Sequence, residues 1–516
     1  METAILKNVA INFVGLVLPA FISLVTVPSY IHLLGVDRYG FIALVWTLIG
    51  YFGVLDFGMS IATENQISKA CASGNTPQIE RLFWSAFWLN LGTGLCGSVV
   101  VLAGAGLYNW LGYATTPLQH EIMSAVPWLA LAVPISNVSW VFAGAINGAE
   151  RFGVFNTNQT LGTFIFQLLP LGAAWMFGAT LPVVIAAAIV SRFIAGAMLG
   201  AAVIRILGVR HVLAPEWKLV RELFGYGGWV VLGNAASGIA DTLDRTMIGT
   251  LMGARYVTFY TVPQNLVTKL QMLQTALHRT LFPRLSALER DGADRVARDG
   301  LSFLNGVLTP LCVIGIFAIG PFMHVWVGHA VANASLPVGR VLIIAVWFFG
   351  QSALARILLQ AQGHPVATTR VSLITLPIVA AALWLGIHLF GILGAAVVML
   401  IRAALENVVL SWLASIRAKA TMIEAVVHLS FLVVSLAIVG PLTEHFGVGV
   451  SLAAGALVFV CSMVWSWVSS PGLRMLARMS MARMSSLRFR PSLPKSSLSN
   501  KSAPDPLTKP EPETAK

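Results

Sequence analysis

Charge is scarce in this sequence, and so are the motifs that mark catalytic or nucleotide-binding domains. Only 10% of the 516 residues are Asp, Glu, Lys or Arg, whereas a soluble domain carries about 25%. A soluble fold would therefore lack the polar surface that must face water. The sequence also contains no phosphate-binding GxxxxGK(S/T) loop, no HExxH and no GxSxG pattern. We therefore expect that the protein does not hydrolyse ATP and is not an enzyme.

Cysteine is equally rare. The four cysteines are Cys71, Cys96, Cys312 and Cys461, and no two of them have CxxC spacing. This pattern favours neither a disulfide framework nor a zinc site. We expect no metal and no cofactor.

Apolar residues dominate instead, at 57% of the chain with a mean hydropathy of +0.80. A helix that crosses a bilayer needs about 20 mostly apolar residues. By that measure the chain holds about fourteen spans, and the loops between spans seven and eight and between eleven and twelve are very short. The expected spans are 9–34, 40–63, 83–107, 122–146, 154–177, 181–204, 223–252, 256–283, 301–327, 338–361, 367–390, 392–413, 422–441 and 448–469.

The basic residues indicate the orientation of these spans. Alternate loops are rich in Lys and Arg, whereas the other set holds little beyond Arg38, Arg255 and Arg340. Basic loops face the cytoplasm, so both termini are predicted to be cytoplasmic. The formal charge of +12 is spread over many loops, and we therefore expect no nucleic-acid partner.

Two short segments recur along the chain. Gly35–Tyr39 resembles Gly253–Tyr256, and Ile146–Phe152 resembles Leu358–His364, each pair about 210–220 residues apart. Six spans separate the copies, which makes them parallel repeats. We expect an all-α integral membrane protein of two six-helix bundles and two C-terminal helices. The predicted units are 1–208, 209–415, 416–470 and a basic, disordered cytoplasmic tail at 471–516.

Ionisable residues inside spans are costly and indicate function or pairing. Asp241, Asp244 and Arg245 share one face of span seven, because residues three and four apart are neighbours on a helix. Asp241 and Arg245 can pair, which leaves Asp244 free. A packing ion pair is the structural alternative.

Other charged residues extend this pattern to further spans. Lys269 in span eight and Arg192 in span six have no partner in their own helix, and they are the candidates for holding an anion. Arg356 lies near the end of span ten, where it can snorkel to the membrane surface. Arg402 and Glu406 are four residues apart and can neutralise each other. Asp56 in span two is a candidate structural or coupling residue.

Several of these segments resemble one family. Pro28–Gly40, Gly53–Met59 and Asp244–Gly249 followed by Tyr260 are similar to the signatures of Wzx-type polysaccharide flippases. These proteins belong to the multidrug/oligosaccharidyl-lipid/polysaccharide exporter superfamily. The resemblance covers about residues 5–420 and leaves out the tail.

The resemblance implies a function and a location. It implies that the chain moves an oligosaccharide on undecaprenyl pyrophosphate across the bacterial inner membrane by alternating access, for surface polysaccharide, O-antigen or exopolysaccharide biosynthesis. The family's cavity is cationic, and Arg192, Arg245 and Lys269 would supply that charge here, with Asp244 beside them. Membrane lipids, a polysaccharide polymerase and export machinery are the implied partners. The two extra helices could form a groove for the lipid tail.

Two alternatives stay open. A cation-coupled drug or metabolite exporter of the same superfamily would need a carboxylate at mid-membrane, and Asp241 or Asp244 could serve. A membrane-embedded polymerase or ligase for lipid-linked sugars would need a large outer loop, and every expected outer loop is short.

Overall fold

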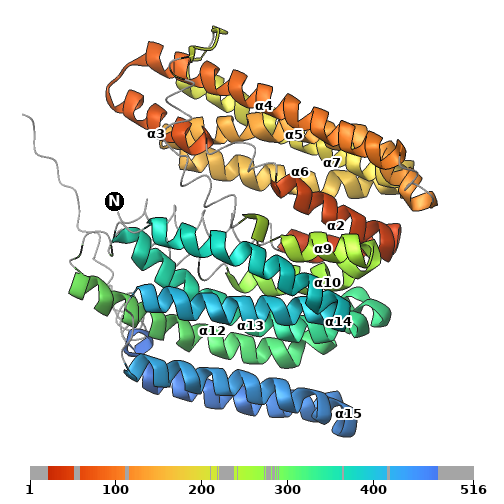
Figure 1. Cartoon of the computed structure of the whole chain (residues 1–516), viewed down its shortest axis with the longest axis vertical. Helices are drawn as coiled ribbons and strands as arrows, with labels where there is room; N and C mark the ends of the chain where they lie inside the picture. Colours follow the sequence, from red (N-terminus) through yellow and green to blue (C-terminus); the bar gives the residue numbers. More distant parts are fainter. Residues whose placement is uncertain are drawn as a thin grey trace, which may run out of the picture.

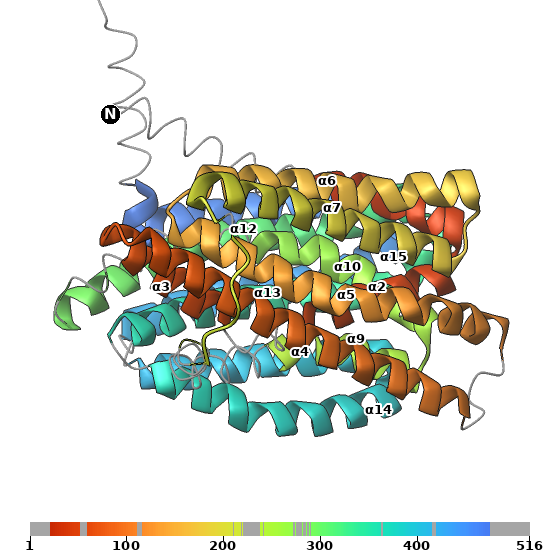
Figure 2. The same cartoon turned by 90° about the horizontal axis from the view of Figure 1, so that it is seen from above.

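The computed structural model shows a bundle of long helices that run roughly along one direction (Figure 1 and Figure 2). It describes residues 21–51, 59–110, 116–209, 211–217, 219, 238–240, 242–271, 274, 281, 285, 288, 290–362, 365–414 and 419–474. No strand occurs among these residues. Eight of the described helices are long and apolar enough to cross a membrane. The expected all-α integral membrane fold is confirmed.

The first bundle comprises seven described helical segments, which begin with an apolar helix at Phe21–Leu34. The others are α2 (Val36–Tyr51), α3 (Met59–Ala72), α4 (Thr76–Trp110), α5 (Pro117–Gly148), α6 (Phe152–Phe177) and α7 (Leu181–Leu207). The start of α5 shows why these segments become helices where they do. Thr116 and Gln119 cap each other's backbone N–H groups at 3.3 and 2.8 Å, and Pro117 takes the first helical position.

The second bundle contains 238–240, α9 (Leu243–Leu251), α10 (Ala254–Val267), the short 3₁₀ turn η2 (Thr268–Leu270), α12 (Arg290–Val327), α13 (His329–Ala361) and α14 (Pro365–Leu413). The final element is α15 (Lys419–Ser469), which packs along α12 at the end of the molecule opposite α4 (Figure 1). The two extra C-terminal helices therefore lie on the outside of the second bundle.

The longest two helices are each a pair of spans. Helix α14 has 49 residues, far more than the roughly 20 that cross a bilayer, and it folds back at Gly391 with φ of +60°. Gly386 and Gly394 meet across this turn, because a Cβ added to Gly394 would collide with the Gly386 carbonyl oxygen. Helix α15 folds back at Gly447 with φ of +82°. With these two hairpins counted as four spans, the eight candidate helices supply ten spans, and the expected spans one, two, seven and eight are described in part.

The two bundles meet along α2, α9 and α10 (Figure 1). The Thr258 hydroxyl of α10 donates a hydrogen bond to the Val36 carbonyl at 2.6 Å, and Gly40 of α2 packs directly against the Ala254 backbone. The Trp326 indole of α12 donates to the Leu24 carbonyl at 2.6 Å. These contacts hold one end of the bundles together.

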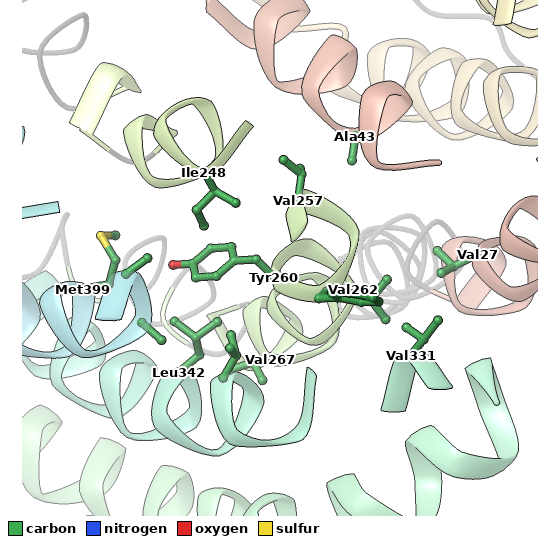
Figure 3. Packing of buried hydrophobic residues seen from close by; sticks show 14 of the residues in the cluster. Val27, Ala43, Ile248, Val257, Tyr260, Val262, Val267, Val331, Leu342 and Met399 are labelled. Atoms are coloured by element: carbon green, nitrogen blue, oxygen red, sulfur yellow. The ribbon is translucent and has the colours of Figure 1, made fainter. Parts of the chain in front are cut away.

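A single large apolar cluster crosses this junction. It includes Val27 and Ala43 from the first bundle and Ile248, Val257 and Tyr260 from the second (Figure 3). Smaller clusters occupy the interior of each bundle on its own. The polar residues described next are therefore held by well-packed apolar surroundings.

Candidate functional site

Asp244 is the most deeply buried acidic residue at the junction of the bundles. It lies in the first turn of α9 and is fully buried. Its Oδ2 accepts hydrogen bonds from the Tyr260 hydroxyl at 2.8 Å and from Gln264 Nε2 at 3.0 Å. Its Oδ1 accepts from the Arg245 backbone N–H at 2.7 Å. Three donors among the described residues therefore converge on this carboxylate.

Arg245 completes this network on its other side. Its Nε donates to Gln264 Oε1 at 2.6 Å, and one terminal nitrogen donates to the Thr47 hydroxyl of α2 at 3.4 Å. The Gln264 amide therefore bridges Asp244 and Arg245 while Arg245 reaches across to the first bundle. Such a buried network, when fully satisfied, fixes the geometry of the elements that carry it.

This geometry corrects one expectation. Asp244 is not a free carboxylate, because Tyr260 and Gln264 of α10 already donate hydrogen bonds to it. The helical spacing within span seven could not reveal partners that come from another helix. The expected pairing of Asp241 with Arg245 falls outside the described residues, as does Asp56.

Lys269 lies five residues beyond Gln264, where α10 tightens into η2. The side chain is half-buried, and within the described part of the chain nothing forms an ion pair or a hydrogen bond with its ammonium group. Short 3₁₀ segments inside long helices often mark functional or strained positions. Lys269 therefore stays a predicted anion-binding residue.

Arg192 belongs to the first bundle, on α7. Its guanidinium carbon lies 4.7 Å from the centroid of the Phe166 ring on α6. Its Nε is buried and has no hydrogen-bond partner among the described residues. A cation over an aromatic face gains about 0.5–2 kcal/mol, whereas an unsatisfied buried polar atom costs about 1–3 kcal/mol. Arg192 is therefore held in place while part of its donor capacity stays unused.

A pocket of about 260 Å³ opens beside Arg192, between α5, α6 and α7. Aromatic and polar side chains share its lining. The aromatic residues are Trp140, Phe155 and Phe166. The polar residues are Ser136, Ser139, Asn158, Gln159, Thr163 and Arg192.

Helix α2 connects Arg192 with the network around Asp244. The Trp46 ring lies 4.9 Å from the Phe166 ring that supports Arg192, and the next residue, Thr47, accepts from Arg245. Thr47 is the residue that sequence reasoning missed, because its partner is 198 positions away and nothing local marks it. Arg192 and Arg245 are thus linked through neighbouring side chains rather than by direct contact.

A second charged cluster lies within the second bundle. Arg356 of α13 forms an ion pair with Glu406 of α14, and Arg402 lies 4.0 Å from the other Glu406 oxygen. Arg402 also donates to the Ala240 carbonyl at 2.7 Å, just before the start of α9. The partner of Arg356 lies 50 positions away on another helix, which the sequence analysis did not anticipate. The expected pairing of Arg402 with Glu406 is confirmed.

The fold now defines a class of protein. The arrangement of its two helical bundles is that of multidrug transporters and of a lipid II flippase. The chain superposes on an inward-facing multidrug resistance MATE family transporter with a TM-score of 0.67 at 12% identity, over 78% of this chain and 95% of that one. It superposes on the lipid II flippase MurJ in an inward closed conformation with a TM-score of 0.62 at 13% identity, over 88% and 97%.

The sequence places the chain within this class more narrowly. Residues 5–289 match the polysaccharide biosynthesis protein family, and the chain belongs to that family. It is 26% identical over 419 residues to a putative O-antigen transporter of Shigella flexneri, covering 80% of this chain and 97% of that protein. It is 22% identical over 415 residues to a probable flippase of Haloferax volcanii, covering 78% and 80%. The expected family is confirmed.

Proposed function

We propose that this protein flips an oligosaccharide linked to undecaprenyl pyrophosphate from the inner to the outer leaflet of the bacterial inner membrane. The observation that carries this proposal is a pair of cations inside the spans, Arg192 on the first bundle and Lys269 on the second. Neither has an acidic partner among the described residues. A charged side chain within a membrane costs about 2.5–3.5 kcal/mol, and an anionic pyrophosphate would offset that cost.

The comparisons support a transporter of this kind. The chain belongs to the polysaccharide biosynthesis protein family, and the relative from Shigella flexneri is named as an O-antigen transporter. The polymer made from the transported unit would be a surface polysaccharide or an exopolysaccharide. A polysaccharide polymerase and export machinery would act after the flipped glycan reaches the outer leaflet.

The proposed site residues have distinct roles. Arg192 and Lys269 contact the pyrophosphate, and Arg245 adds positive charge at the junction of the bundles. Asp244 fixes Arg245 through the shared Gln264 amide. Asp56 and Asp241 are proposed as structural or coupling residues, and Arg356 is proposed to act structurally through Glu406.

The two bundles would alternate access to the site as units 1–208 and 209–415, with 416–470 attached to the second. The observed contacts between Val36 and Thr258 and between Gly40 and Ala254 lie at the ends that the predicted topology places at the periplasm. Closure at that end leaves the cytoplasmic side as the route of loading. Both termini and the basic tail at 471–516 would then be cytoplasmic.

The alternative of a cation-coupled drug exporter has less support. Such a transporter needs a titrating carboxylate within the membrane, and Asp244 already accepts three hydrogen bonds from within the protein. The fold is compatible with drug transport, since the MATE family shares it. A polymerase or ligase is supported by no feature of the described outer connections, which are short turns such as Gly35 and Gly328.

Charge removal at the two unpaired cations tests the proposed function. Arg192→Ala and Lys269→Ala should each lower surface polysaccharide by about tenfold and leave lipid-linked precursor on the cytoplasmic leaflet. Lys269→Arg should retain more export than Lys269→Ala, because it keeps the charge. Surface polysaccharide and precursor would be quantified in cells at matched protein levels.

Arg81→Ala is the matched control. Arg81 is also a cation, but it pairs with Glu216 at 3.6 Å with more than half of its side chain exposed. Its loss should leave export near wild type, since exposed ion pairs contribute about 0–1 kcal/mol. Normal export by the Arg192→Ala/Lys269→Ala double variant would overturn the proposal.

A further inference from the structure

The segment 211–217, which follows α7 and leads toward the second bundle, is bound along one face of α4 (Figure 2). Three side chains of α4 form hydrogen bonds with backbone groups of this linker segment. The three bonds run from His211 N–H to Glu80 at 2.8 Å, from Trp88 Nε1 to the Leu213 carbonyl at 3.0 Å, and from Glu216 N–H to Ser85 Oγ at 3.1 Å. They extend over about two turns of α4. The linker segment therefore belongs structurally to the first bundle.

The depth of these contacts places the linker segment at the membrane surface. The predicted topology puts the start of α4 on the cytoplasmic side. Trp88 lies five residues inside the expected span 83–107, which corresponds to about 8 Å at a rise of about 1.5 Å per residue. The headgroup layer on each side of the hydrocarbon core is about 5–8 Å thick. Leu213, which is bound to Trp88, therefore lies at the depth of the lipid headgroups.

The side chains that the linker segment exposes are suited to that layer. Val212 is 65% exposed and Trp217 is 78% exposed. Tryptophan is enriched at membrane surfaces, because its ring is apolar while its N–H seeks a polar partner. The turn between α3 and α4 lies on the same side of the membrane in the predicted topology, and it exposes Ser73, Gly74 and Asn75 instead. The two connections thus differ in the surroundings that their side chains fit.

The polar groups of the linker segment are directed toward α4. Irregular backbone at membrane depth persists only where protein groups bind its N–H and C=O groups. Ser85 is fully buried, and its hydroxyl accepts from the Glu216 N–H. Arg81 adds an ion pair with the Glu216 side chain at 3.6 Å. Helix α4 therefore binds the polar groups, while Val212 and Trp217 face the surroundings.

We propose that the linker segment 211–217 is an interfacial anchor, which inserts Val212 and Trp217 among the lipid headgroups of the cytoplasmic leaflet. The first bundle carries the anchor through Ser85 and Trp88. The anchor goes beyond the proposed function, since it does not depend on which substrate the protein transports. Lipids around these side chains would hinder the approach of a soluble partner protein.

Spin labels measure the depth of the anchor. Val212→Cys, Trp217→Cys and Ser73→Cys would each be introduced alone into a full-length chain without the four native cysteines, and each would be labelled with a nitroxide. The protein in lipid nanodiscs would be studied by power-saturation electron paramagnetic resonance, with oxygen as the lipid-soluble reagent and a nickel chelate as the water-soluble one. The oxygen-to-nickel accessibility ratio at positions 212 and 217 should be several-fold higher than at the exposed control position 73.

A double variant tests whether α4 holds the anchor. Trp88→Phe removes the indole donor and Ser85→Ala removes the hydroxyl acceptor, while most of each side chain is kept. The combined variant should increase the mobility of the label at position 217 and lower its oxygen-to-nickel ratio. Trp175→Phe is the matched control, because it also removes an indole N–H from a 79% exposed side chain, at the opposite end of the bundle. Gel filtration would verify that each variant is folded.

Three results would overturn the anchor. Labels at positions 212 and 217 that meet nickel as freely as the label at position 73 would show a segment in water. A surface reserved for a soluble partner would give that same result, because the purified protein contains no partner. Low accessibility to both reagents would show burial between protein surfaces. Unchanged mobility and depth in the folded Ser85→Ala/Trp88→Phe variant would show that α4 does not hold the segment in place.

Discussion

Gln264 connects two opposite charges through a single amide group. Its nitrogen donates to Asp244 and its oxygen accepts from Arg245, so a carboxylate and a guanidinium are both satisfied without touching through their side chains. Because an amide carries one donor end and one acceptor end, no carboxylate or ammonium could replace it. The positive charge of Arg245 is thereby kept near Thr47 of the other bundle.

Tyr260 provides the most specific test of this network. Tyr260→Phe removes one donor from a fully buried carboxylate and should destabilise the protein by about 1.5–3 kcal/mol, the usual contribution of a hydrogen bond to a charged group. Thermal unfolding in detergent would show a lower Tm. The matched control is Tyr256→Phe, one turn earlier on α10, where the side chain is 39% exposed. Equal Tm values for the two variants would contradict a structural role for the Tyr260 hydroxyl.

The limits of sequence reasoning are clearest for single residues. Lys269 and Arg192 could be selected as candidates because no acidic residue lies within a helical turn of either. The partners of Asp244, Arg245 and Arg356 could not be found in that way, since they come from other helices. Side-chain pairing between distant segments is set by packing, which a hydropathy pattern does not contain.

At the scale of helices, two glycine turns determine how the longest apolar segments are divided. Gly391 and Gly447 combine positive φ with extended ψ, a backbone region that is essentially restricted to glycine and costs other residues about 1–3 kcal/mol. Each turn lets one apolar run form two antiparallel spans without a polar loop. In the second hairpin the Thr443 hydroxyl donates to Ser451 at 3.0 Å across the turn.

Gly394 tests the first hairpin. A Gly394→Ala change places a methyl group against the Gly386 carbonyl, and the two arms of α14 must separate to accommodate it. We expect a loss of about 1–3 kcal/mol of stability, as for other overpacked sites. Gly440→Ala in α15 is the control, because nothing lies within 4 Å of the added carbon. It should be neutral or slightly stabilising by helix propensity, and a comparable loss in both variants would refute the packing argument.

Most of the elements themselves could be predicted. The expected short connections between spans seven and eight and between eleven and twelve correspond to turns at Gly253 and Gly391. Apolar length and glycine position are local properties, so they can be read along the chain. The start of α9 at Leu243, inside the expected span 223–252, was not foreseen. Just before this helix start, the distant Arg402 donates a hydrogen bond to the Ala240 carbonyl.

For the whole molecule, the junction of the bundles determines which side is closed. Leu44 of α2 and Gly249 of α9 belong to different bundles, and a Cβ added to Gly249 would lie 3.3 Å from Leu44 Cγ. The two positions are therefore in direct contact, and we expect cysteines there to form a disulfide on oxidation.

A Leu44→Cys/Gly249→Cys variant tests alternating access. In a background without the four native cysteines, oxidation should stop polysaccharide export and reduction should restore it. Gly306→Cys/Ser466→Cys is the matched control, because these positions join α12 to α15 within one half, with a Cβ separation of 3.5 Å. Its oxidation should leave export intact. Undiminished export by the fully oxidised Leu44→Cys/Gly249→Cys protein would show that this junction does not need to open.

The closed end of the bundles has a consequence for how the sequence can change over evolution. Thr258 and Trp326 each donate to a backbone carbonyl, at Val36 and Leu24, and Gly40 packs against a backbone carbonyl at Ala254. Every amino acid supplies a carbonyl, so the accepting positions can drift among apolar residues without losing the bond. Only the donors and the glycine are constrained by chemistry. One partner in each contact can thus vary between relatives while the contact itself persists.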